Sequence, residues 1–165
     1  HRVSRGRLAG HPHGEDHGKP VNRVVFAGLG VFILALSAFV GWANIRKSPI
    51  NWIYYTPDRF AEARAANDVV VLEFTAEWCA NCKALEAGVL HTRAVYSELN
   101  GDGVRPIKVD LTGNNEDGNA KLKDVGRITI PLLVVFDRNG NEVFKSDSYT
   151  QGQVLEALET ARGAG

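Results

Sequence analysis

The chain contains two cysteines, Cys79 and Cys82, which are separated by two residues and preceded by Trp78. They follow the apolar run 69–74, which is typical of a buried strand, and residues 83–89 have helical character. If a helix begins near Cys79, its sulfur lies at the helix N-terminus, where free N–H groups and the helix dipole favour the thiolate. Cys82 follows about one turn later and can close a disulfide with Cys79. We therefore expect a pair that cycles between dithiol and disulfide and carries two electrons.

Three other interpretations of the cysteine pair compete with redox chemistry. A zinc site would need two more ligands, and beyond residue 43 the chain offers only His91 as a further His or Cys. A purely structural disulfide would close so short a loop that it would restrict the unfolded chain little. Two inert core cysteines are the third interpretation, but an aromatic residue before Cys-x-x-Cys after a strand is not typical of random placement. We favour redox chemistry and expect no metal at this site.

The composition is that of a globular protein with appendages. The chain has 165 residues, of which 44% are hydrophobic and 23% charged, and its formal net charge is zero. No basic face of the kind that binds nucleic acid stands out in the sequence. The chain contains no methionine and therefore no initiator residue. We expect it to be a fragment of a longer protein or a chain trimmed at its N-terminus.

Residues 1–23 form a polar segment rich in His and Arg, for which we expect a loop or a tail. His11, His13 and His17 could bind a metal ion, but a solvated polar loop is the interpretation that we favour.

Residues 24–43 are twenty consecutive residues without a charge. At about 1.5 Å per residue, a helix over this segment spans about 30 Å, the hydrocarbon thickness of a bilayer. A cleaved signal peptide and a buried soluble helix are the alternatives. We expect one transmembrane helix in a bacterial inner membrane. More basic residues precede this segment than follow it closely, which predicts that the cysteine domain lies in the periplasm.

After a juxtamembrane linker at residues 44–55, the pattern of apolar and turn residues predicts an α/β domain over 56–162. The expected sheet is mixed, with about four strands and helices on both faces. Expected helices cover 56–66, 79–88, 92–99, a segment from 114, and 151–162; expected strands cover 69–74, 104–110, 132–136 and 142–145.

This element order, with Trp-Cys-x-x-Cys after the first strand and Pro131 before the third, resembles the thioredoxin fold. The stretch 74–86 most resembles the C-terminal domain of the thiol:disulfide interchange protein DsbD family. In that family the domain follows the last transmembrane helix of a multi-span electron-transfer domain. Segment 24–43 occupies the equivalent place.

The resemblance implies a protein-disulfide reductase whose only redox group is the Cys79–Cys82 disulfide, without a further cofactor. A membrane electron-transfer domain, on the same or another chain, would reduce this disulfide. The dithiol would then reduce the protein's own N-terminal periplasmic domain, which serves disulfide isomerases and cytochrome c maturation. The expected partners are thus periplasmic thioredoxin-fold or disulfide-bonded proteins. A stand-alone membrane-anchored thioredoxin-like protein that reduces apocytochrome c is the alternative. A non-catalytic docking module and an oxidase are further alternatives.

Two carboxylates near the cysteines match acidic positions of these families. Glu73 stands six residues before Cys79, where thioredoxins carry a buried acid, and Glu86 lies four residues after Cys82. Negative charge beside the sulfurs would disfavour the thiolate and raise the cysteine pKa. Surface positions are the alternative for both residues.

Pro131 matches the cis-proline that the superfamily places opposite the active disulfide. A cis Ile130–Pro131 bond would present the backbone of Ile130 for strand-like pairing with a partner. We expect the partner to be contacted also by Trp78, Ala80 and Asn81.

Overall fold

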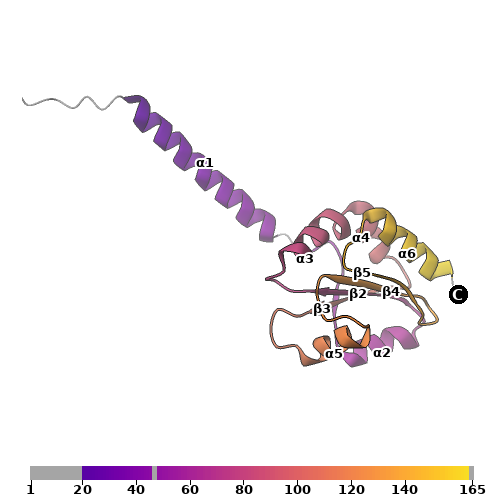
Figure 1. Cartoon of the computed structure of the whole chain (residues 1–165). Coiled ribbons are helices and arrows are strands. Elements are labelled where there is room, and N and C mark those ends of the chain that lie inside the picture. Colours follow the sequence, from indigo (N-terminus) through magenta and orange to yellow (C-terminus); the bar gives the residue numbers. More distant parts are fainter. Residues whose placement is uncertain (1–19, 46–47, 164–165) are drawn as a thin grey trace, which may run out of the picture. The chain divides into compact units, whose positions relative to one another are not determined.

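The computed structural model describes residues 20–45 and 48–163, and the chain divides into two compact units, His1–Lys47 and Ser48–Gly165. In the first unit, helix α1 spans Pro20–Ile45 (Figure 1). Its described side chains, those of residues 25–39, are all exposed. The segment 24–43, which we predicted to cross a membrane, lies within α1. No helix in the described part of the chain combines the length and the hydropathy of a membrane-spanning segment.

The possible metal ligands His11, His13 and His17 lie outside the described residues. Most of the predicted polar segment 1–23 also lies outside them.

The second unit contains a mixed sheet in the order β1-β3-β2-β4-β5. β1 and β2 run parallel to β3, whereas β4 runs antiparallel to both β2 and β5. The strands are β1 Ile53–Tyr54, β2 Val69–Thr75, β3 Val104–Asp110, β4 Leu132–Phe136 and β5 Glu142–Ser146. The helices are α2 Pro57–Ala65, α3 Ala80–Leu85, the π-helix η1 Glu86–Leu90, α4 Arg93–Leu99, α5 Glu116–Asp124 and α6 Gln151–Gly163.

Helices cover both faces of this sheet, with α3, α4 and α6 on one side and α2 and α5 on the other (Figure 1). Because successive side chains of a strand point to opposite faces, the fully buried strand β2 contributes to two cores. Val69 and Val71 pack in the core beneath α4 and α6. Val70, Leu72 and Phe74 pack in the core on the other face, together with the two cysteines. The predicted α/β fold, a mixed sheet flanked by helices, is thus confirmed.

The expectation of about four strands was wrong, because the sheet has five. The additional strand is β1, inside the segment that we predicted to be a linker. Its two residues pair with Ile107 and Lys108 of β3, and the Tyr55 N–H donates to the Lys108 carbonyl over 2.9 Å. Two residues are too few to produce a recognisable alternation in the sequence.

The helix that follows the cysteines also differs from the expected single α-helix over 79–88. It begins as α3 and continues as the π-helix η1 from Glu86 to Leu90. A π turn holds one residue more than an α turn and often occurs at functional sites. Here Glu86, the first residue of η1, is buried, with 6% of its surface exposed.

Packing of the central strands should dominate the stability of this unit. Ile107 of β3 has no exposed surface, whereas Ile128 is 82% exposed. We predict that Ile107→Ala lowers the free energy of unfolding by about 2–5 kcal/mol, because it removes buried methyl groups and leaves a cavity. Ile128→Ala makes the same change at an exposed position and should cost less than about 0.5 kcal/mol. Urea unfolding of the oxidised full chain measures both; equal losses would contradict this description of the core.

Candidate functional site

Cys79 and Cys82 are joined by a disulfide, with an S–S distance of 2.01 Å and a Cα–Cα distance of 5.3 Å. Cys79 is the N-cap residue of α3, and its Sγ accepts a hydrogen bond from the backbone N–H of Cys82 over 3.2 Å. Both residues are more buried than their place at a helix end suggested. The exposed fraction is 8% for Cys79 and 2% for Cys82, so Cys79 is the more accessible of the two residues.

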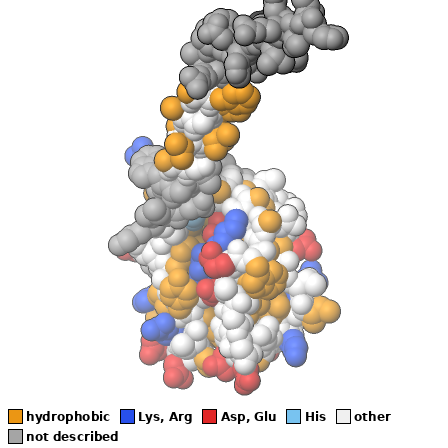
Figure 2. Space-filling model, turned by 90° about the vertical axis from the view of Figure 1, so that its left-hand side faces the viewer, with side chains coloured by type: hydrophobic (Ala, Val, Ile, Leu, Met, Phe, Trp, Pro, Cys, Tyr) orange, Lys and Arg blue, Asp and Glu red, His pale blue; other side chains and the backbone are white. Residues whose placement is uncertain are grey.

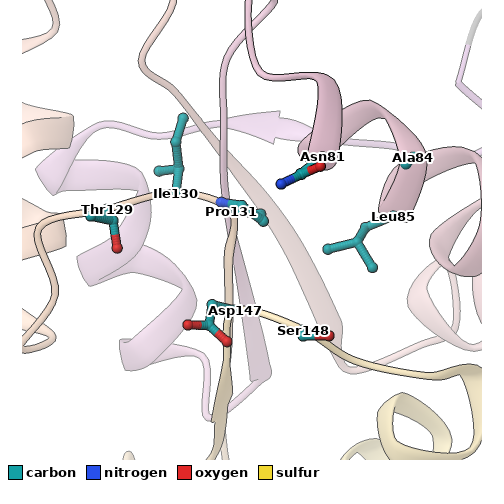
Figure 3. A pocket seen from close by; sticks show the side chains of 8 residues that line it. All are labelled: Asn81, Ala84, Leu85, Thr129, Ile130, Pro131, Asp147 and Ser148. Atoms are coloured by element: carbon teal, nitrogen blue, oxygen red, sulfur yellow. The ribbon is translucent and has the colours of Figure 1, made fainter.

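A groove with a volume of about 440 Å³ lies beside the residues between the two cysteines (Figure 3). Its centre is Pro131, and the Ile130–Pro131 peptide bond is cis. On one side of Pro131 lie Asn81, Ala84 and Leu85 of α3, and on the other side lies Thr129 (Figure 3). The remaining lining residues, Asp147 and Ser148, come from the segment between β5 and α6.

The groove therefore brings together three of the residues that we predicted for partner binding, Asn81, Ile130 and Pro131. Trp78 is 67% exposed and Ala80 is exposed, but neither lines the groove. Sequence reasoning did not identify Thr129, Asp147 or Ser148, which carry no motif and reach the groove only through the fold.

Glu73 of β2, Lys108 of β3 and Glu86 of η1 form a charged cluster that is largely removed from water. Glu73 and Lys108 are paired residues of the adjacent strands β2 and β3, so the sheet register places them side by side. The Lys108 ammonium lies 3.4 Å from Glu73 Oε2 and 3.0 Å from Glu86 Oε1. One ammonium group thus interacts with two carboxyl groups. The same ammonium group also lies over the Trp52 ring, 5.1 Å from the ring centroid.

Glu86 has further partners that Glu73 does not share. Thr75 donates its hydroxyl hydrogen to Glu86 Oε1 over 3.1 Å. Lys83 Nζ lies 3.7 Å from Glu86 Oε2 and 2.6 Å from the exposed Glu77. Glu73 Oε2, by contrast, is buried and has no hydrogen-bond partner among the described residues. Figure 2 shows acidic and basic side chains intermixed on one face of this unit, with hydrophobic side chains exposed around them.

These contacts separate the pKa values of the two carboxyl groups. Burial raises the pKa of Glu73 to about 8, and the nearby Glu86 adds to the shift, whereas Lys108 opposes it. Burial would also raise the pKa of Glu86, but Lys108, Lys83 and the Thr75 hydroxyl outweigh it and hold that pKa below its usual value. Near neutral pH, Glu86 is therefore ionised and Glu73 protonated.

Other titratable groups near the cluster are shifted by burial. Burial raises the pKa of Tyr149, and the carboxylates of Glu73 and Glu86 add to the shift. Burial lowers the pKa of His91, whose Nε2 lies 3.1 Å from Ser48 Oγ. Among the residues that the structure describes, no group of three or more His, Cys, Asp or Glu could hold a metal ion.

The raised pKa of Glu73 should make the unit less stable as the pH rises. Because the folded chain holds this proton more tightly than the unfolded chain, stability is full below about pH 4.5 and falls until about pH 8. Glu73→Gln removes the titrating group. The unfolding free energy of the wild type should therefore fall relative to that of the variant as the pH rises. We predict a relative change of about 3 kcal/mol across this range.

Urea unfolding of the oxidised full chain at several pH values measures this difference. Glu159→Gln makes the same replacement at an exposed position of α6 and serves as the control. Parallel curves for the wild type and Glu73→Gln would show that Glu73 titrates normally.

Comparison with known proteins places this geometry in a family. The family model described as Thioredoxin matches residues 51–160. The thiol:disulfide interchange protein DsbD of Yersinia enterocolitica is 27% identical over 143 residues, which cover 68% of this chain and 24% of the relative. The protein disulfide-isomerase of Oryctolagus cuniculus is 35% identical over 128 residues, covering 78% of this chain and 24% of the relative. The chain thus spans about a quarter of the length of each of these relatives.

Among solved structures, the oxidised C-terminal domain of DsbD from Neisseria meningitidis is 25% identical, with a TM-score of 0.53 over 67% of this chain and 99% of that domain. The reduced form of the same domain has a TM-score of 0.54 at 24% identity, and covers 67% of this chain and 100% of that domain. The match to the family model begins at residue 51, just before β1, and ends within α6, so it includes the disulfide, the groove and the charged cluster. The chain belongs to the thioredoxin family, and its second unit is a DsbD-like thioredoxin-fold domain.

Proposed function

We propose that this chain is a thiol:disulfide oxidoreductase that acts as a protein-disulfide reductase through Cys79 and Cys82. The observation that carries the proposal is the Cys79–Cys82 disulfide at the N-terminus of α3, next to a groove that contains the cis Ile130–Pro131 bond. A partner segment in the groove can pair with the backbone of Ile130, which is how an extended chain adds to a strand edge.

The reaction is an exchange of two electrons between two pairs of sulfur atoms. In the reduced chain, the Cys79 thiolate attacks one sulfur of a partner disulfide, which forms a mixed disulfide and releases the other partner sulfur as a thiolate. Cys82 then attacks Cys79, which closes the Cys79–Cys82 disulfide and frees the second partner sulfur. The partner gains two electrons and two protons. Cys79 is the attacking residue because it is the more exposed of the two.

The charged cluster sets the electrostatic field behind these sulfurs. Glu73 holds a proton near neutral pH and can accept or release one as Cys82 changes between thiol and disulfide. The charge of Glu86 is offset by Lys108 and Lys83. The two carboxyl groups therefore raise the cysteine pKa less than two free negative charges would.

The likeness to the DsbD relatives supports a proposal for the direction of electron flow and for the partners. We propose that a membrane electron-transfer domain, on this or another chain, reduces Cys79–Cys82. The dithiol then reduces thioredoxin-fold or other disulfide-bonded proteins of the periplasm.

Placement at the bacterial inner membrane through segment 24–43 is part of the same proposal. The proposal is supported by the side chains of α1 that the structure describes, those of residues 25–39. Nine of them are large, hydrophobic and exposed. These are Val25, Phe26, Leu29, Val31, Phe32, Ile33, Leu34, Leu36 and Phe39.

The redox mechanism predicts different results for the two cysteine variants. Cys79→Ser should lower the rate of reduction of a protein disulfide, with dithiothreitol as the electron source, to the level of dithiothreitol alone. Cys82→Ser should instead accumulate a mixed disulfide with the substrate, because Cys79 attacks but nothing resolves the product. Non-reducing electrophoresis detects this adduct. Full activity of Cys79→Ser would favour a non-catalytic docking module.

The membrane placement predicts that the chain, produced in a bacterium, stays in the membrane fraction after extraction with alkaline carbonate. Deletion of residues 24–43 should release it into the soluble fraction. Release of the undeleted chain by carbonate would contradict an integral membrane segment without affecting the redox proposal.

A further inference from the structure

The groove beside the disulfide contains one ionisable side chain, Asp147. It is exposed and lies in the short segment between β5 and α6. Every other residue that lines the groove is uncharged: Asn81, Ala84, Leu85, Thr129, Ile130, Pro131 and Ser148. A partner chain that enters the groove therefore meets one net charge there, and it is negative.

Within residues 20–45 and 48–163, no ion pair or side-chain hydrogen bond engages the Asp147 carboxylate. The basic residue nearest to it in sequence, Lys145, is committed elsewhere: its ammonium lies 2.8 Å from Glu142 and donates to the Val125 carbonyl over 3.0 Å. Arg127, in the loop before the cis-proline, is exposed and forms no ion pair with Asp147. The charge of Asp147 is thus available to a partner.

The surroundings of Asp147 suit a cation. In Figure 3 the Asp147 carboxylate and the Thr129 hydroxyl lie on the same side of Pro131, away from Leu85. An ammonium or guanidinium group that enters the groove would find the Asp147 carboxylate as a charged acceptor, and the Thr129 hydroxyl is a further acceptor in the groove lining. An acidic side chain in the same place would face a like charge without compensation.

We propose that Asp147 is a specificity-determining residue that favours partners with Lys or Arg close to their reactive disulfide. This inference rests on the proposed function, since it concerns partners of the same groove. Asp147 takes no part in bond making: the dithiol of Cys79 and Cys82 loses two electrons and two protons, and the partner disulfide gains them. A charge at the rim of an interface acts mainly on the rate of encounter, so the effect falls on kcat/KM.

The test uses the pre-reduced full chain and a set of capped peptides, each closed by one intramolecular disulfide. The peptides are otherwise built from Ala, Gly and Ser, and carry Lys, Ala or Glu at one position within three residues of either cysteine. Mass spectrometry follows their reduction. At the peptide position where the charge has the largest effect, we expect the kcat/KM of the Lys peptide to exceed that of the Glu peptide by about three- to tenfold at low salt. Because the effect is electrostatic, 0.5 M NaCl, our chosen high-salt condition, should reduce it to about twofold or less.

The variants separate Asp147 from the general charge of the chain. Asp147→Asn should bring the Lys-to-Glu ratio close to one, and Asp147→Lys should invert it. Asp102→Asn makes the same change of charge at an exposed aspartate outside the groove and should leave the ratio unchanged. Circular dichroism checks that each variant is folded.

Two different failures are distinguishable. If the wild type reduces all peptides at equal rates, or if Asp147→Asn keeps the wild-type ratio, the specificity inference is wrong and the reductase remains. If the wild type reduces none of the peptides faster than Cys79→Ser does, the proposed function itself is wrong.

Discussion

One ammonium group, that of the largely buried Lys108, sets the charge balance of the cluster formed with Glu73 and Glu86. It lies between two carboxyl groups that are both removed from water, 3.4 Å from Glu73 and 3.0 Å from Glu86. A single positive charge cannot stabilise two buried negative charges equally, and the additional contacts of Glu86 decide which group ionises. The result is one ionised and one protonated carboxyl group in the same cluster. A neutral acid and a compensated anion can thereby coexist behind a pair of sulfurs.

The sheet makes this arrangement possible. Parallel pairing of β2 and β3 brings Glu73 next to Lys108, and the π-helix η1 begins with Glu86, whose carboxylate reaches the same ammonium group. Each strand and helix therefore contributes one member of the cluster. The disulfide follows directly from the carboxyl end of β2, so the same strand holds the carboxyl group and leads to the reactive cysteine.

Much of this unit could be predicted from local sequence. The apolar runs of β2 and β4 and the cysteine spacing indicated the fold, and the strand bounds of β3 and β4 agree with the expected ones. The two-residue strand β1 was missed because it is too short to show a period. The role of Lys108 was missed because it depends on the register between strands far apart in sequence. Asp147 was missed because a loop residue gives no signal until the fold brings it to the groove.

The charge of Glu73 could not be predicted from the sequence for a related reason. Two acidic residues near the cysteines suggested two negative charges, but burial of Glu73 and the nearby charge of Glu86 leave Glu73 protonated near neutral pH, although Lys108 opposes this shift. Sequence gives the identity of an ionisable group, whereas its charge depends on neighbours and on access to water.

The edge strand β1 has a mechanical consequence. The backbone enters the second unit at Ser48 and reaches β3 within a few residues, where Tyr55 bonds to the carbonyl of Lys108 and Trp52 lies beneath its ammonium. Tension applied to the N-terminal end of this unit would first load the hydrogen bonds of Ser48 with His91 and of Asn51 with Asn100, and then these few contacts. Such a pull would therefore reach the residue that balances the buried charges before it reached β2, the central strand of the sheet.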